Sequence, residues 1–283
     1  MIRGSCLCGD VAWEYSGTPD FMGACHCSMC RKEHGAAFAT AVAGSAEGYR
    51  LLRGKDSITG YESSPGAVRP FCSRCGSPVP PEPVPGRPSF MPAGCLDDDP
   101  GVRSSTNLFV ASRAPWHEIT DDVPSFDAYP PEIDAPVTER PRATEPRAGA
   151  ARGSCLCGGI AYEIEGEHET ILNCHCSRCQ KAHGVAHASV LLVDPAQFRW
   201  LRGEELLQSY RVPDAQRFKH CFCRVCGSSL PEVHGDQVVA KIGTLDDDPG
   251  ARPRCHIFTS SKAPWFDITD DLPQFEEYPT REL

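Results

Sequence analysis

The 283-residue chain is acidic and rich in cysteine: 40% of its residues are hydrophobic, 23% are charged and 17 are cysteines. These proportions exclude a mainly disordered chain, and the length predicts about two domains of roughly 100–200 residues each. Because the formal net charge is −10 and the basic residues form no cluster, we expect no nucleic-acid partner.

The beginning of the chain bears on its compartment. The first residues, MIRGSCLC, lack the basic stretch and apolar run of a signal peptide, and no apolar run reaches the roughly 18 residues of a membrane helix. We therefore expect a cytoplasmic protein with no membrane partner. In a reducing compartment, closely spaced cysteines bind metal more often than they form disulfides.

The sequence is a tandem repeat. The segment GSCLCG at residues 4–9 recurs at 153–158, an offset of 149, and the cysteine cluster at 25–30 recurs at 174–179 with the same offset. The blocks LDDDPG and APW also occur once in each half. A period this long indicates two complete domains rather than the units of a solenoid.

The joint between the halves is rich in proline and in charges of both signs, and it contains no aromatic residue. Such a composition is typical of a stiff, solvated linker. We therefore predict a first domain at residues 1–131, a linker at 132–152 and a second domain at 153–283.

The predicted elements are mostly short strands. In chain order, alternating runs at 10–15, 159–164 and 237–242 are separated by glycine and proline, and the step at 234–236 is a hairpin signal. Helical turns are predicted directly after the central cysteine clusters, at 28–34 and 177–183. A further short helix is predicted at 272–277, with its equivalent near Val123, and Asp270 and Asp271 would cap it or form a turn before it.

Each half contains seven cysteines in the same order, CxC, CxCxxC and CxxC. Pairs one or two residues apart can bind one ion from a tight turn, and two such pairs supply the four thiolates of a closed tetrahedral zinc site. The CxC and CxxC pairs of each half therefore predict a structural zinc. The ligands would be Cys6, Cys8, Cys72 and Cys75 in the first half, and Cys155, Cys157, Cys223 and Cys226 in the second.

The remaining CxCxxC cysteines of each half form a group of three: Cys25, Cys27 and Cys30, and Cys174, Cys176 and Cys179. Three thiolates on one zinc leave a coordination position open, which distinguishes a catalytic zinc from a structural one. Two alternatives stay open: His34 or His183 completes a closed site, or the group holds no metal. Altogether the sequence predicts four zinc ions per chain, two structural and two open.

Other candidate residues have simpler expected roles. His26 and His175 stand between two predicted ligands, where the chain direction turns their side chains away from the ion. Cys95, Cys221 and Cys255 fall outside the repeated pattern and are expected to be plain thiols.

Several blocks together resemble a known family. CxC, CHCSxC followed by HG, CxxCGS, LDDDPG and HIFTSSKAPWFDITDDLPQFEEYP are similar to the glutathione-dependent formaldehyde-activating enzymes, a family that includes the centromere-protein V relatives. The resemblance implies two tandem zinc-containing β-tent domains of the Mss4-like type. It also implies that the four-cysteine sites are structural and that the CxCxxC sites are catalytic.

The activity that the resemblance implies is that of a carbon-sulfur lyase, which forms or cleaves S-hydroxymethylglutathione. The partners would be a small-molecule thiol such as glutathione and a small aldehyde such as formaldehyde. A substrate thiol bound at the open position would be deprotonated at neutral pH and could attack the aldehyde carbonyl. Arg178, Lys181 and Lys262 could meet substrate carboxylates, or they could be ordinary surface charges.

The two halves differ at one candidate catalytic position. The second half has His256 where the first half has Asn107, so only the second half could shuttle the carbonyl proton through an imidazole. The first half also contains seven prolines in residues 78–92, which weaken strand pairing there.

A second class of function also fits the sequence. Under this hypothesis the zinc ions only stabilise two small domains that bind a protein partner, and the chain has no catalytic activity. The sequence allows the two domains to pack on each other under either hypothesis.

Overall fold

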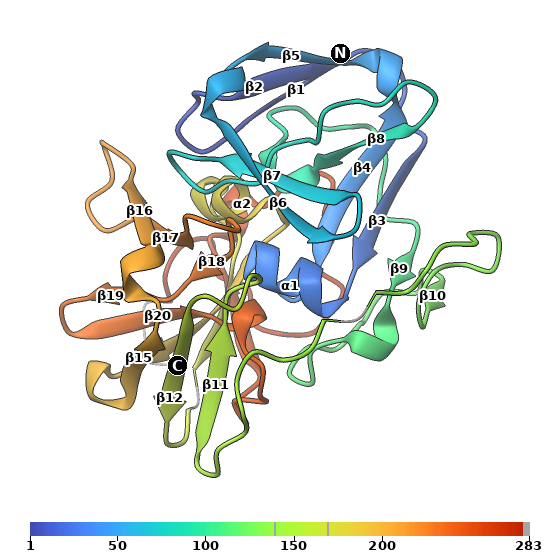
Figure 1. The fold of residues 1–283 in the computed structure, drawn as a ribbon. Helices are drawn as coiled ribbons and strands as arrows, with labels where there is room; N and C mark the ends of the chain where they lie inside the picture. The colour runs from blue at the N-terminus through green and yellow to red at the C-terminus, as the bar shows by residue number, and fades with distance from the viewer. Residues whose placement is uncertain (139, 169, 280–283) are drawn as a thin grey trace.

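A computed structural model describes residues 1–138, 140–168 and 170–279, so the end of the predicted second domain, residues 280–283, lies outside the described residues. The fold is mostly β, with two short α-helices in the described residues, and its two halves share most of their order of elements. Figure 1 shows the first half above the second. The predicted fold class, two mostly β domains, is confirmed.

The first domain contains a small three-stranded sheet, a five-stranded sheet and a hairpin. The three-stranded sheet has the order β1-β2-β5, the five-stranded sheet has the order β10-β9-β3-β4-β8, and β6 pairs with β7. The bounds are β1 (Ile2–Ser5), β2 (Ala12–Tyr15), β3 (Phe21–Cys25), β4 (Ala39–Ser45), β5 (Tyr49–Arg53), β6 (Ile58–Ser64), β7 (Ala67–Cys72), β8 (Pro88–Pro92), β9 (Asn107–Leu108) and β10 (Ser125–Phe126).

The second domain repeats this plan with two short strands that the first domain lacks, β18 and β19, and without a counterpart of β10 in its described residues. Its sheets have the orders β11-β12-β15, β19-β20-β14-β13-β21 and β16-β17-β18. The bounds are β11 (Ala150–Ser154), β12 (Ala161–Glu165), β13 (Ile171–Cys174), β14 (Ala188–Val193), β15 (Phe198–Arg202), β16 (Leu207–Arg211), β17 (Lys219–Cys223), β18 (Ser229–Leu230), β19 (Glu232–His234), β20 (Gln237–Lys241) and β21 (Pro253–Ile257).

The two predicted helical turns are confirmed as α1 (Ser28–His34) and α2 (Ser177–His183). Each begins at a cysteine N-cap whose sulfur accepts a hydrogen bond from a backbone N–H three residues later, and each ends at a glycine in the left-handed region. Both boundaries therefore follow from local chemistry that the sequence makes visible.

The proline-rich stretch behaves as the sequence predicts. β8, which contains the last two of its prolines, lies at the edge of the first domain's sheet, where a missing N–H donor is tolerated. The equivalent strand of the second domain, β20, pairs on that side with β19, and Gly235 with φ 51° makes the predicted hairpin turn. The second domain therefore has a strand that the first lacks.

The prediction of a helix at 272–277 is wrong. This segment is extended and lies beside β21, with His256 N–H donating to the carbonyl of Pro273 and Phe275 N–H donating to the carbonyl of His256. The corresponding segment near Val123 leads into the short strand β10. Backbone pairing with a distant strand outweighs the local helical pattern, while Asp270 does form the predicted turn by accepting from the N–H of Leu272.

The helix of each domain packs against the other domain. Figure 1 shows α1 beside β18 of the second half, and α2 among the elements of the first half. The approach is close because the turns that face the helices contain glycine: a Cβ on Gly243 would lie 2.1 Å from the backbone nitrogen of Ala36, and one on Gly94 would lie 2.2 Å from that of Val185. Only glycine fits at either position.

Each domain also buries a tryptophan side chain in the core of the other domain. Trp116 is buried in the apolar core built mainly from the second domain, with Leu156 and Ile160, and Trp265 is buried in the core of the first domain with Trp13. Each domain therefore completes the hydrophobic core of the other.

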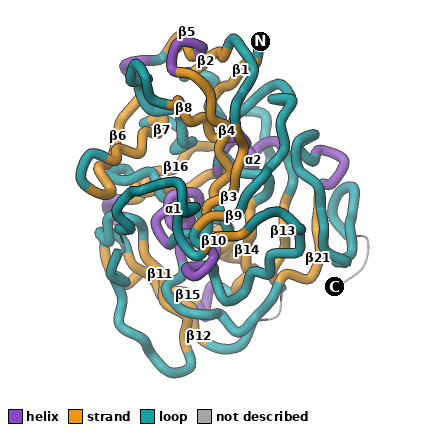
Figure 2. The backbone as a smooth tube through the Cα atoms, turned by 90° about the vertical axis from the view of Figure 1, so that its right-hand side faces the viewer, coloured by secondary structure: helices purple, strands orange, loops and turns teal. Residues whose placement is uncertain are grey.

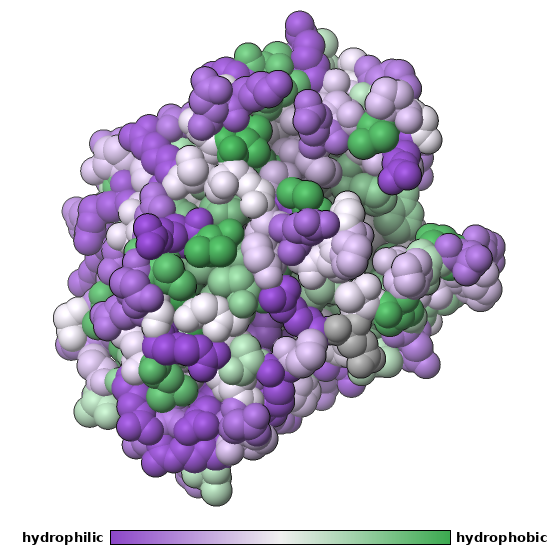
Figure 3. Space-filling model, in the orientation of Figure 1, coloured by the Kyte–Doolittle hydropathy of each residue, from purple (hydrophilic) through white to green (hydrophobic). Residues whose placement is uncertain are grey.

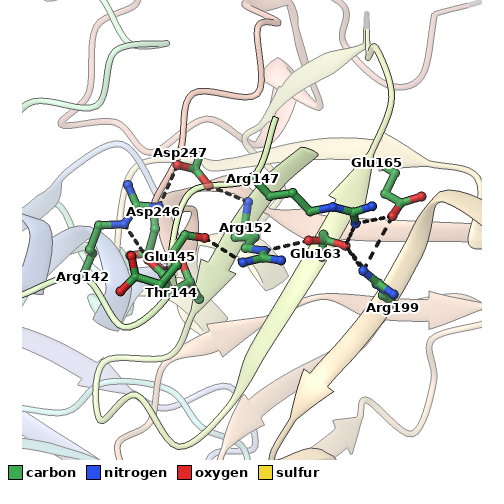
Figure 4. A network of polar contacts seen from close by, with 10 residues as sticks. All are labelled: Arg142, Thr144, Glu145, Arg147, Arg152, Glu163, Glu165, Arg199, Asp246 and Asp247. Carbon is green, nitrogen blue, oxygen red and sulfur yellow. Dashed lines mark hydrogen bonds and ion pairs between the residues drawn. The ribbon is translucent and has the colours of Figure 1, made fainter. Parts of the chain in front are cut away.

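The segment between the domains contacts the second domain through charged side chains (Figure 4). Arg142 pairs with Asp247, the hydroxyl of Thr144 donates to Asp246 over 2.9 Å, and Arg147 pairs with Glu163. The last three residues of the predicted linker begin β11. Figure 2 shows this connection as a loop that runs along the molecule into β11.

The surface is largely hydrophilic on the face shown in Figure 3, where hydrophobic residues form small separate patches. Within the described residues, no helix combines the length and apolar character required to cross a bilayer.

Candidate metal centres

The CxC and CxxC pairs of each domain meet in one place. Their four sulfur atoms lie within 4.8 Å of one another in both domains. Neighbouring sulfurs are separated by 3.5 Å between Cys6 and Cys8, and by 3.8 Å between Cys157 and Cys223. Zinc–sulfur bonds of about 2.3 Å place the sulfurs of a tetrahedral site about 3.8 Å apart, so these groups fit zinc.

Backbone and hydroxyl groups orient these thiols. In the first domain, the N–H of Val11 donates to the sulfur of Cys6, and Ser77 lies beside Cys75 while its hydroxyl accepts from the N–H of Leu7. The knuckle turns at Gly76 with φ 76°. The second domain repeats the arrangement through Ser228.

The CxCxxC cysteines form two separate groups of three, with their sulfurs within 4.8 Å of one another. In the first domain, Cys25 ends β3, Cys27 caps α1, and Cys30 lies in its first turn. In the second domain, Cys174 ends β13 and the other two cysteines occupy the same places at α2. A strand end and a helix start thus converge on one point.

No histidine or carboxylate of the described residues joins either group of three. His34, one predicted fourth ligand, donates from Nδ1 to the backbone carbonyl of His183, and His183 donates in the same way to the carbonyl of His34. Both rings therefore serve the contact between the domains. Three thiolates with no fourth protein ligand in the described chain suit a zinc whose remaining position takes an exchangeable ligand.

A pocket of about 370 Å³ lies beside the first group of three and is lined by Cys25 and Cys30. Arg69, from β7, also lines it, with its two terminal nitrogens 3.7 and 3.8 Å from the sulfur of Cys30. The same guanidinium pairs with Glu33 of α1. A cation so close to a thiol favours its thiolate form.

A strained phenylalanine and a tyrosine stand beside each group of three. Phe109 and Phe258 adopt the left-handed region, with φ 59° and 57°, and each packs edge-to-face on a tyrosine, Tyr129 or Tyr278, with ring centroids 4.8 Å apart. Burial, and then the negative charge of the three cysteines, raises the pKa of both tyrosines. Backbone strain in a bulky residue is often kept at a functional site.

Comparison with known proteins identifies the family. A family model described as glutathione-dependent formaldehyde-activating enzyme matches residues 1–112 and 150–261, which is most of the chain. The chain belongs to this family.

The two matched segments also confirm that the family domain is duplicated in tandem. Among curated proteins, none matches the chain significantly. Of solved structures, a crystal structure of a Rhodobacter sphaeroides protein is 24% identical over 34% of this chain and 89% of that one, with a TM-score of 0.28. A likeness at that level carries no argument about fold or function.

His256, the predicted proton carrier of this family member, lies in β21 in register with Asn173, the neighbour of Cys174. Its Nδ1 is 2.8 Å from Nε2 of His175, and its Nε2 is 3.0 Å from a carboxylate oxygen of Asp270. Asn107 makes the corresponding contacts with His26 and Asp121 in the first domain.

The predicted basic residues lie in three different surroundings. Lys181 forms an ion pair with Asp97 of the other domain, Lys262 donates to the carbonyl of Phe266, and Arg178 is exposed. The three cysteines outside the repeat, Cys95, Cys221 and Cys255, are buried free thiols, as expected. The local sequence carries no signal for Arg69, because its approach to Cys30 depends on long-range folding. The packing of Tyr129 and Tyr278 on the strained phenylalanines likewise has no local signal.

Proposed function

We propose that this member of the family is a zinc-dependent carbon-sulfur lyase that acts on an adduct of a thiol and an aldehyde, with S-hydroxymethylglutathione as the model substrate. One observation carries the proposal: each domain has three convergent thiols that no fourth described ligand completes, and a pocket lies beside those of the first domain. We further propose four zinc ions per chain, one in each cysteine group, and a cytoplasmic location.

The residues of the first site have two roles, zinc binding and substrate binding. Cys25, Cys27 and Cys30 would hold the zinc, which when bound would lower the pKa of a substrate thiol so that the thiolate is present at neutral pH. Arg69 would attract the negative charge of that thiolate and hold the substrate at the pocket.

The reaction is an addition without redox change. In the direction of synthesis, a bond forms between the substrate sulfur and the aldehyde carbon, the carbonyl π bond breaks, and the proton lost by the thiol is balanced by one gained at the carbonyl oxygen. We assign the hydroxyl of Tyr129 in the first domain, and that of Tyr278 in the second, as donors of a hydrogen bond to that oxygen, because each ring packs on the strained phenylalanine of its own site.

The role of His256 is part of the same proposal. Its ring contacts His175, which stands between Cys174 and Cys176 in the chain. We assign it as a positioning residue that orients His175, with the carboxylate of Asp270 fixing its own ring.

Turnover of S-hydroxymethylglutathione by the zinc-loaded protein tests the proposal, after subtraction of the spontaneous reaction. Cys27→Ser and Cys176→Ser each remove one ligand from one group of three, and Cys95→Ser is the matched control because Cys95 is a buried thiol outside all four groups. We expect at least one of the two ligand variants to lose activity while the control keeps it. A protein that turns over no adduct, with several thiols tried, would instead favour a non-catalytic module that binds a protein partner.

A further inference from the structure

A second cavity lies between the two domains. It has a volume of about 750 Å³ and is lined by residues of both domains, but by no cysteine. His26 lines it, whereas the preceding residue, Cys25, lines the pocket beside the first group of three, and Ala24 and Thr40 line both. The cavity is therefore not the site at which the cysteine groups act.

Aromatic rings form its inner wall. Phe38 contacts His117 of its own domain at 5.3 Å between ring centroids, and it contacts His187 and Phe266 of the other domain at 5.8 and 6.5 Å. In the repeat, Phe38 corresponds to His187 and His117 corresponds to Phe266. Among these four rings, each domain thus contributes one phenyl ring and one imidazole, at positions that are reversed between the repeats; His26 and His256 also line the cavity.

His117 and His187 each have a ring nitrogen without a hydrogen-bond partner among the described residues. His187 is only 5% exposed, and its single polar neighbour among the described residues is the hydroxyl of Ser189, 3.5 Å from Nδ1, so Nε2 has no partner. His117 makes no side-chain hydrogen bond within the described residues. Burial lowers the pKa of both histidines, that of His187 to about 3, so at neutral pH each ring is uncharged and offers a lone pair.

The cavity carries an excess of negative charge. Five acidic and two basic residues line it, and both basic residues, Arg103 and Arg252, already pair with Asp99 and Asp248. The two carboxylates best placed to act together are Asp121 and Asp270, because the hydroxyls of the preceding residues, Thr120 and Thr269, lie 2.5 Å apart across the domain boundary.

These features select the chemical class of the ligand. An anion would meet uncompensated carboxylates, which is unfavourable. A metal ion would need at least three convergent donors, and within the described residues only the four cysteine groups provide them. An ammonium group, in contrast, is attracted by carboxylates and by aromatic faces and donates to neutral imidazole nitrogens.

We propose that the cavity between the domains binds a small organic amine cation, with ammonium groups at Asp121 and Asp270 and an alkyl portion against Phe38 and Phe266. The unpartnered Nε2 of His187 accepts a further hydrogen bond from the ligand. The site requires both domains, because each supplies one carboxylate and one phenyl ring. It does not depend on the reaction proposed for the cysteine groups.

Isothermal titration calorimetry on the zinc-loaded full chain tests this site with three probes of similar length, all at the same ionic strength. The probes are 1,4-diaminobutane, 1,4-butanediol and succinate, which carry two positive charges, no charge and two negative charges. We expect one molecule of the diamine to bind per chain, and the diol and succinate to bind at least tenfold more weakly. A diamine that binds no more tightly than the diol would overturn the proposal.

Variants test whether the diamine binds in this cavity. Asp121→Asn with Asp270→Asn should weaken diamine binding at least tenfold, and His187→Phe, which copies the first domain at that position, should weaken it severalfold. Glu204→Gln is the matched control, because this exposed acid lies outside the cavity. Zinc content and unfolding temperature show that each variant is folded. Unchanged diamine affinity in the folded double variant would contradict the site.

Discussion

Lys32 of the first domain forms a buried ion pair with Asp246 of the second, with 2.8 Å between Nζ and Oδ1. The ammonium also donates to the carbonyl and the hydroxyl of Ser154, over 2.9 and 2.8 Å. The repeat places Lys181 in the reverse contact, with Asp97 and Ser5. These reciprocal lysines tie the helix of each domain to the other domain.

Removing the Lys32 ammonium should destabilise the protein, because Asp246 would then be buried without its countercharge. We predict that Lys32→Met lowers the free energy of unfolding by about 3–5 kcal/mol. Lys181→Met is the matched comparison: its partner Asp97 is 37% exposed, so water can replace the ammonium and the loss should be smaller. Urea unfolding of the zinc-loaded variants measures both. Equal losses would contradict the assigned difference in burial.

Glu163 should contribute stability that is constant near neutral pH. Burial alone would raise the pKa of this carboxyl, but hydrogen bonds from Arg152, Arg199 and Arg147 lower it to about 2 (Figure 4). Because its pKa in the unfolded chain is about 4.3, the contribution is complete above that pH and is lost only as the pH falls toward 2.

We therefore predict that Glu163→Gln destabilises the protein by about 1.5–3 kcal/mol, equally at pH 8, 6.5 and 5. Glu14→Gln is the control from the equivalent position in the first domain, where Arg50 is the one side-chain ion-pair partner in the described residues, and its effect should be below about 1 kcal/mol. Urea unfolding at the three pH values checks both. A loss that already shrinks between pH 8 and pH 5 would show that the carboxylate is not held ionised.

The four-cysteine groups should be needed for folding. A structural zinc in a small domain contributes on the order of 10 kcal/mol, so Cys72→Ala and Cys223→Ala should be insoluble or poor in metal, and a chelator should unfold the wild type. Cys255→Ala, which removes a buried cysteine outside the groups, should keep about four zinc ions by elemental analysis. Normal folding of both ligand variants without zinc would refute the structural assignment.

His256 should affect only the second domain's site. His256→Asn copies the residue that the first domain has at this position, so the variant should fold with its full zinc content while the second site loses part of its kcat, about tenfold, at nearly constant KM. The measurement needs the first site silenced by Cys27→Ser. Asn107→His in the first domain serves as the reciprocal control. Unchanged kinetics after His256→Asn would leave this histidine with a structural role alone.

The structure agrees with the sequence where the signal is local. The cysteine groups follow from spacing and from the repeat, and α1 and α2 follow from a cap and a glycine stop within one short segment. The edge position of β8 follows from proline chemistry, because its missing N–H groups exclude a central place in the sheet.

The structure departs from the local sequence pattern where distant segments decide the conformation. Residues 272–277 have a helical pattern, but they pair with the backbone of His256 instead. The burial of Trp116 in the opposite domain, the contact of Lys32 with Asp246 and the approach of Arg69 to Cys30 leave no trace in the local sequence. The cavity between the domains is likewise a product of their packing.

The most direct test of the central claim is the turnover of S-hydroxymethylglutathione by a variant that carries both Cys27→Ser and Cys176→Ser. This variant keeps every ligand of the two four-cysteine groups, so it should fold and retain about two zinc ions. We predict that its rate falls to that of the spontaneous reaction while the wild type is clearly faster. A folded double variant that turns over the adduct as fast as the wild type would contradict the claim that the three-cysteine groups perform the chemistry.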